Sequence, residues 1–237
     1  MRYFFLLIVA VTVGFSTWAS APMFGYPLNS MNQGQISNLY PNLVTPATYA
    51  FSIWGLIYLT WGVLALLIAT GYIKAKNKFL WVFSSAIFIS SLWLIPFQYQ
   101  WELTSLGVMF WILALALWSV RLSRKEHIFT RLTSELFLGW ITVATAANIA
   151  VVVVSTPLLA NIWVFSPVIW TLIGLAVATA VHVWVLIRYN SYVTGLVLVW
   201  ALVANIVEHT DRLQQIGVGA LILIMLGAQG YTYFSKK

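Results

Sequence analysis

Residues 46–78 read PATYAFSIWGLIYLTWGVLALLIATGYIKAKNK. This stretch carries no charged side chain before Lys74, and it ends in Lys74, Lys76 and Lys78. Because about 20 consecutive apolar residues cross the hydrocarbon core of a bilayer as a helix, the first part predicts a transmembrane helix. Lysine accumulates in short cytoplasmic loops, so the second part predicts the cytoplasmic end of that helix.

The whole chain has the composition of a membrane protein. Of its 237 residues, 62% are hydrophobic, 16% are aromatic and only 7% are charged, whereas a soluble domain has about 25% charged residues. The chain has no cysteine, which excludes disulfides, thiol nucleophiles and thiolate metal sites. Its net charge of +7 comes from cations scattered between apolar runs, so nucleic acid is not an expected partner.

Apolar runs separated by charged residues, Pro, Gly or Asn predict an all-α polytopic bundle of about eight transmembrane helices. The expected spans are 3–20, 46–72, 79–99, 103–120, 132–155, 162–187, 191–207 and 213–234. The alternative for the first span is a cleavable secretory signal over residues 1–21, because Arg2 and an apolar stretch precede small residues there. Cleavage would leave seven helices.

The positions of Lys and Arg support this count. With eight spans and a cytoplasmic N-terminus, all but one of the 12 Lys and Arg residues fall on the inner side. The inner cations are Arg2, Lys74, Lys76, Lys78, Arg121, Arg124, Lys125, Arg131, Arg188, Lys236 and Lys237, and the exception is Arg212. We therefore expect a multi-pass protein of the cell (inner) membrane with both termini in the cytoplasm.

The longest loop between expected spans, residues 21–45, contains no charge and many Asn, Gln, Ser, Gly and Pro residues. Its aromatic and apolar content predicts that it folds over the outer mouth of the bundle. A flexible extracellular connector is the alternative.

Few ionisable residues lie in or beside the spans. Glu135 follows Arg131 at i, i+4 spacing, which favours an ion pair over a proton relay. His182 has no second ligand at metal-binding spacing, and Glu208, His209 and Asp211 favour a solvated loop over a metal site. No span contains lysine, which excludes a retinal Schiff base. Phosphate-binding loops, zinc-protease and nucleophile-elbow motifs are also missing, so no catalytic residue is assigned.

Aromatic and amide side chains recur on single helix faces. Trp54 and Tyr58 are four residues apart, and Trp140 and Asn148 share a face of the fifth span. Such surfaces suit a large flat ligand, with amides to orient it. Ordinary packing of helix on helix is the alternative.

The chain resembles the TspO/MBR family of tryptophan-rich sensory proteins, also called translocator proteins. Pro46, Trp54, Tyr58 and Gly62 match the pattern of the family's second helix, the end of its third helix is matched by Trp93, Pro96 and Phe97, and Trp140 with Asn148 matches its fifth. The resemblance covers about residues 1–155. It implies a five-helix core over 1–155. Residues 156–237 lie outside the family pattern, and their three expected spans predict a C-terminal extension packed in the same bundle.

The resemblance also implies a pocket under the first outer loop that binds a tetrapyrrole- or sterol-like ligand. The expected ligand-binding residues are Trp54, Tyr58, Trp93, Phe97, Trp140 and Asn148, and the loop amides Asn29, Asn32, Gln33 and Asn38 are expected to reach porphyrin carboxylates. We expect no metal and no obligatory cofactor, although haem or protoporphyrin could be the ligand. The expected partners are membrane lipids and this ligand, and a homodimer is left open.

Two other functions are alternatives. A small-solute transporter is suggested by the eight spans, by the apparent break of span six at Pro167, and by a weak repeat between residues 51–62 and 165–177. A membrane isomerase or cyclase acting on an isoprenoid or lipid would need Glu135 or Glu208 as its acid.

Overall fold

The computed structural model describes residues 1–20, 25, 28–156 and 166–235, and this part of the chain is helical without strands. Eight long helices form the bundle: α1 (Arg2–Ser20), α3 (Ile53–Ala69), α4 (Asn77–Leu92), α6 (Glu102–Ser123), α7 (Ile128–Ser155), α9 (Pro167–Tyr189), α10 (Tyr192–Glu208) and α11 (Arg212–Phe234). Three short helices join them: α2 (Gln33–Asn38), η2 (Thr48–Ser52) and α5 (Leu94–Gln98). The prediction of an all-α membrane bundle is confirmed.

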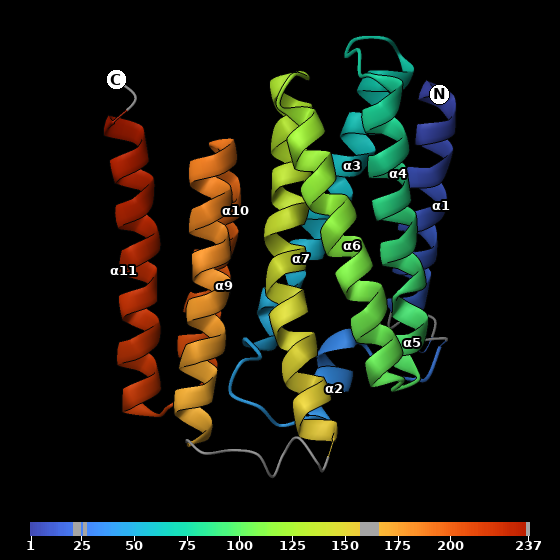
Figure 1. Cartoon of the computed structure of the whole chain (residues 1–237). Coiled ribbons are helices and arrows are strands. Elements are labelled where there is room, and N and C mark those ends of the chain that lie inside the picture. Colours follow the sequence, from blue (N-terminus) through green and yellow to red (C-terminus); the bar gives the residue numbers. More distant parts are fainter. Residues whose placement is uncertain (21–24, 26–27, 157–165, 236–237) are drawn as a thin grey trace.

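The helix lengths agree with membrane crossing. Among the described residues, 7 helices are long and apolar enough to span a bilayer, when η2 is counted with α3 and α5 with α4. The remaining helix, α10, has 17 residues, which is the lower limit for a span. The two ends of the chain lie at the same end of the bundle (Figure 1), as an even number of crossings requires.

The surface and the interior have the polarity expected in lipid. Large apolar side chains such as Leu103, Ile216 and Leu223 are more than 70% exposed. Inside the bundle, buried Ser and Thr hydroxyls donate to carbonyl oxygens one turn earlier in their own helices, as Thr142 does to Leu138 and Thr179 to Leu175. These bonds satisfy polar groups that lipid cannot hydrate.

α7 is the central helix, because it packs against α3 and α6 on one side and against α9 and α10 on the other. Gly139 of α7 permits α7 to approach α10 closely. A Cβ added at Gly139 would lie 2.9 Å from the Cβ of Val197 and 3.1 Å from the Cα of Thr194. α9 and α10 are thereby packed directly on the helix that carries Trp140, and α11 packs on α9 and α10.

Pro167, which was expected to break span six, is the first helical residue of the described part of this span. α9 begins at Pro167, and the Ser166 side chain caps it by accepting a hydrogen bond from the Ile169 N–H. Proline is favoured at the first position of a helix, where its missing N–H costs nothing. The expected residues 162–165 of this span lie outside the described residues.

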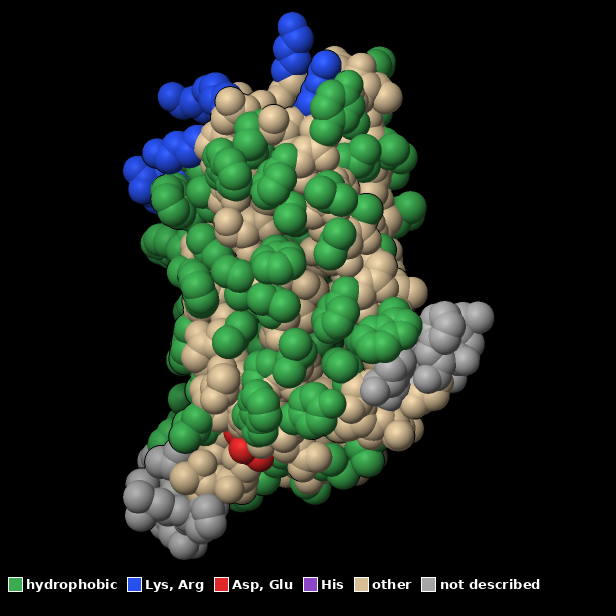
Figure 2. Space-filling view, turned by 90° about the vertical axis from the view of Figure 1, so that its right-hand side faces the viewer, with side chains coloured by type: hydrophobic (Ala, Val, Ile, Leu, Met, Phe, Trp, Pro, Cys, Tyr) green, Lys and Arg blue, Asp and Glu red, His purple; other side chains and the backbone are tan. Residues whose placement is uncertain are grey.

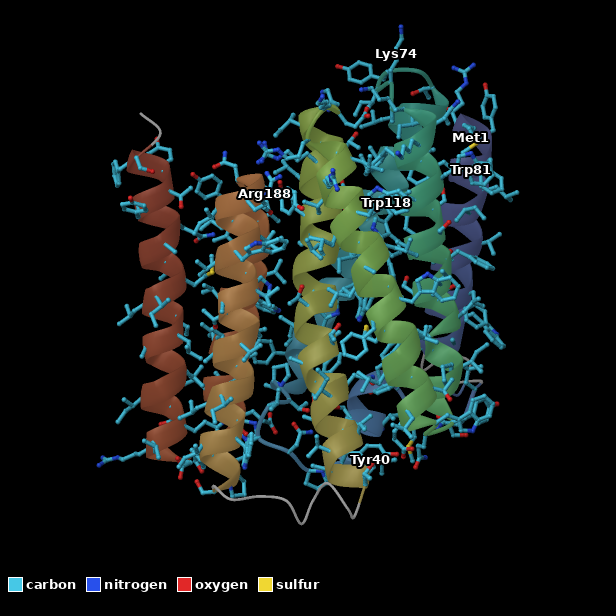
Figure 3. The ribbon with its side chains drawn as sticks, in the orientation of Figure 1. Met1, Tyr40, Lys74, Trp81, Trp118 and Arg188 are labelled. Atoms are coloured by element: carbon cyan, nitrogen blue, oxygen red, sulfur yellow. The ribbon has the colours of Figure 1, made fainter. Side chains whose placement is uncertain are left out.

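Basic side chains gather at one end of the molecule, and the acidic side chains visible in the same view lie toward the other (Figure 2). Met1, Lys74 and Arg188 lie at the basic end, whereas Tyr40 of the first loop lies at the opposite end (Figure 3). We propose that the basic end faces the cytoplasm, because Lys and Arg determine orientation in this way.

Cysteine labelling tests this orientation cleanly, because the chain has no cysteine of its own. Asn38, the last residue of α2, and Lys125, in the turn between α6 and α7, are exposed, and α2 and this turn lie at opposite ends of the bundle (Figure 1). In intact cells, a membrane-impermeant thiol reagent should label Asn38→Cys and not Lys125→Cys. The reverse pattern would mean that the topology is inverted.

Candidate functional site

A small cavity lies beneath α2, enclosed by α7, the start of α3 and the junction of α4 with α5. Its aromatic wall is formed by Phe51, Trp54, Trp93, Phe97 and Trp140. The remaining lining is Gln33, Ser37, Pro46, Val143, Ala144, Ala147, Asn148 and Val151. Its volume of about 30 Å³ is enough for one or two water molecules.

The aromatic rings contact one another around this space. Trp140 meets Phe51 edge-on at 5.8 Å between ring centroids, and it meets Trp54 edge-on at 6.5 Å. Trp93 stacks on Phe97 at 4.5 Å. Both arrangements are favourable aromatic geometries, so three segments far apart in the sequence form one aromatic wall.

Local sequence explains the Trp93–Phe97 stack. α4 ends at Leu92 and α5 begins at Leu94, so Trp93 is the junction between the two helices. Pro96 follows in α5, and its missing N–H is consistent with a new helix starting here. Trp93 and Phe97 are four residues apart, which places both rings on one face.

Several buried polar atoms near the cavity have no hydrogen-bond partner among the described residues. They include the indole nitrogens of Trp93 and Trp140, whose side chains are 6% and 2% exposed. Asn148 donates one hydrogen bond to the Ser105 hydroxyl at 3.0 Å. Buried donors without acceptors are costly and uncommon in native proteins, so the site has unused capacity to bind an acceptor.

Residues 28–47, here called the lid, cover the cavity. Asn32 and Gln35 form a capping box that starts α2, with backbone-to-side-chain bonds of 2.8 and 2.9 Å. One turn of helix then places Gln33 and Ser37 on the face that lines the cavity. In the described part of the first loop, the prediction that it folds over one mouth of the bundle is confirmed, and that this mouth is the outer one stays a prediction.

The lid is attached to α5 and α6 by polar contacts. Asn29 donates to the Gln98 carbonyl, and Gln98 donates through Nε2 to the Met31 carbonyl at 3.2 Å. The Tyr40 hydroxyl donates to Glu102 Oε1 at 2.6 Å. Burial, together with the adjacent Glu102 carboxylate, raises the pKa of Tyr40 above its ordinary value, so the hydroxyl remains a donor at neutral pH.

A family model described as TSPO-like protein matches residues 2–232 of the chain. The chain belongs to this family. No curated protein and no solved structure shows significant similarity to it. The match extends through α9, α10 and α11, beyond the region around residues 1–155 on which the sequence resemblance depended.

In this TSPO-like protein, most of the residues singled out from the sequence converge on the cavity. Trp54, Trp93, Phe97, Trp140 and Asn148 line it. Tyr58 does not, because its ring packs behind that of Trp54 at 5.5 Å.

Of the four loop amides expected to meet a ligand, only Gln33 lines the cavity. Asn29 bonds to Gln98, Asn32 caps α2, and Asn38 is exposed. Sequence reasoning missed Ser37 and Phe51. The i, i+4 spacing of Gln33 and Ser37 after an Asn-x-x-Gln capping pattern was the available signal for Ser37.

Three ionisable residues singled out from the sequence, Glu135, His182 and Asp211, have structural partners. The predicted Arg131–Glu135 ion pair is confirmed, with Nε and Oε1 2.7 Å apart. His182 is buried, and its Nδ1 lies 2.8 Å from the Ala178 carbonyl. Asp211 caps α11 through the Gln214 N–H. No group of three potential metal ligands occurs among the described residues.

Proposed function

We propose that this TSPO-like protein binds a flat, unsaturated hydrophobic ligand between the rings of its aromatic cavity, with a tetrapyrrole as the leading class. One observation carries the proposal: aromatic rings from the α3, α4–α5 and α7 regions line one cavity, and the buried indole N–H groups of two of these residues have no partner among the described residues. Aromatic faces stack on conjugated ligands, and a few polar groups orient them.

The cavity as it stands is too small to hold a tetrapyrrole. Sites for drug-sized ligands enclose about 300–1,000 Å³, whereas this cavity measures about 30 Å³. A tetrapyrrole therefore enters only if the lid moves and the Trp rings separate. The structure is a closed form of the proposed site, and binding is coupled to opening.

The chemistry of the lining predicts how a bound porphyrin would be held. The residues that line the cavity include no cation, so the carboxylates of a porphyrin would be met by neutral donors such as the Gln33 amide and the indole N–H groups. Because few formal charges take part, affinity should depend only weakly on salt.

Truncation of the stacking rings tests the proposal. Trp140→Ala and Trp54→Ala should each weaken protoporphyrin binding about tenfold or more, since one stacking contact contributes about 1–3 kcal/mol. The measurement is porphyrin titration of the protein in lipid nanodiscs, followed by porphyrin absorbance.

Trp111→Ala is the matched control, because Trp111 is 60% exposed on the outer face of α6. It should leave the affinity unchanged. The proposed site would be contradicted if both cavity variants bound protoporphyrin with the wild-type affinity. It would also be contradicted if Trp111→Ala lowered the affinity as much as the cavity variants do.

A further inference from the structure

In the lid segment Asn42–Ala47, two backbone N–H groups are satisfied within the segment, whereas the carbonyl groups of Leu43, Val44 and Thr45 are bonded from outside it. The Asn42 side-chain oxygen accepts hydrogen bonds from the N–H groups of Val44 and Thr45, both at 3.0 Å. Such a turn leaves the carbonyl oxygens pointing away from the segment's own donors. Backbone acceptors at this depth need partners elsewhere, because an unpaired buried acceptor is costly.

The partners come from the C-terminal helices. Asn205 of α10 donates to the carbonyl oxygens of Leu43 and Val44 at 2.9 and 3.2 Å. Gln214 of α11 donates to the same Leu43 oxygen at 2.9 Å and to Asn205 Oδ1 at 2.9 Å. Asn205 and Gln214 are 1% and 0% exposed, so water does not compete for these bonds.

Two further contacts extend the attachment. The Ala47 N–H donates to the Ala204 carbonyl at 3.1 Å, which joins the lid backbone to the α10 backbone. His209 Nε2 lies 3.0 Å from the Thr45 carbonyl oxygen. The carbonyls of three consecutive lid residues and one lid N–H are thus bonded to α10 and α11.

This segment forms part of the wall of the proposed site. Pro46 lies between the bonded residues and lines the aromatic cavity. Pro46 and Val143 also line a second, smaller space of about 10 Å³ between α7, α9 and α10. A displacement of the segment therefore moves Pro46 and changes the cavity directly.

We propose that Asn205 and Gln214 are positioning residues that hold the lid over the ligand site, so that α10 and α11 determine how readily the site opens. The inference rests on the proposed function only for its effect on ligand exchange. The lid attachment itself can be measured without any ligand.

Gln214→Met tests the attachment, because methionine fills a similar volume and has no N–H donor. In nanodiscs without ligand, hydrogen–deuterium exchange of the peptide containing Ala47 should become about fivefold faster or more, the factor for one lost hydrogen bond. The dissociation rate of protoporphyrin should rise by a similar factor. Gln214→Asn, which keeps the amide but is one methylene too short, is the milder variant if Gln214→Met folds poorly.

Gln215→Met is the matched control. The neighbouring Gln215 bonds only within the α10–α11 connection, to the carbonyls of His209 at 2.9 Å and Ile206 at 3.4 Å. It should change neither rate.

The inference would be overturned if hydrogen–deuterium exchange of the lid peptide were unchanged in both Gln214 variants. It would also be overturned if Gln215→Met accelerated this exchange as much as Gln214→Met does. Faster lid exchange with an unchanged porphyrin dissociation rate would also overturn it, because the lid would then not control the site. If the wild-type protein binds no porphyrin, the proposed function fails, and lid exchange alone decides whether Asn205 and Gln214 position the segment.

Discussion

Replacing Arg131 with alanine is expected to lower the free energy of unfolding by about 3–5 kcal/mol, because it leaves the Glu135 carboxylate buried without its partner. Glu135 is 1% exposed, and the Arg131 guanidinium bonds to it and to the Asn190 carbonyl at the α9–α10 turn. The pair therefore joins α7 to the C-terminal helices as well as neutralising a buried charge.

Unfolding in mixed micelles of a mild and a denaturing detergent measures this effect. The double variant Arg131→Met with Glu135→Leu should recover much of the loss, since removing both partners leaves no uncompensated charge. Arg188→Ala is the control, because Arg188 is exposed and its removal should cost under about 1 kcal/mol. Equal losses in Arg131→Ala and Arg188→Ala would show that the pair has no special role.

Gly139→Val is expected to disrupt the packing of α7 on α10. Even a Cβ at this position would lie within 3.1 Å of Val197 and of the Thr194 backbone, and a backbone atom cannot move aside as a flexible side chain can. Overpacking in a tight core costs about 1–3 kcal/mol and sometimes more. We expect the upper end of this range, observed as a lower melting temperature in detergent.

Gly62→Ala is the matched control. Gly62 also lies in a long helix, but a Cβ there would meet nothing within 4 Å. Alanine is a better helix former than glycine by about 0.5–1 kcal/mol, so this variant should be neutral or slightly more stable. If Gly139→Val had the same melting temperature as the wild type, α7 and α10 would not be in close contact.

The helices could be predicted because each depends on a local pattern. The apolar runs and the cations that end them predicted the bounds of seven of the eight long helices to within four residues, when η2 is counted with α3 and α5 with α4. α10 was also expected to be the shortest span, since Glu208 and Asp211 end it early. The sequence interpretation treated Pro167 as a helix breaker, whereas here it occupies the first position of α9, to which proline is equally suited.

The site could be predicted only in part. The aromatic wall followed from helical spacing and from the family resemblance, because Trp54 and Trp140 lie on long helices and the Trp93–Phe97 pair keeps i, i+4 spacing across the α4–α5 junction. The position of the first loop over the bundle was also expected, but the conformation of the lid was not, because it depends on a short helix and on partners remote in the sequence. Nothing near Leu43 in the chain indicates that Asn205 and Gln214 will satisfy its carbonyl oxygen.

The remoteness of those partners has a consequence for biosynthesis. Leu43 and Asn205 are 162 positions apart, and a polypeptide is made from its N-terminus at about 5–20 residues per second. The lid segment therefore leaves the ribosome and reaches the membrane many seconds before the helices that bond to it have been translated. A nascent chain that has inserted only its first five long helices has its aromatic cavity walls but not the final attachment of their cover, so closure of the site is among the last events of its assembly.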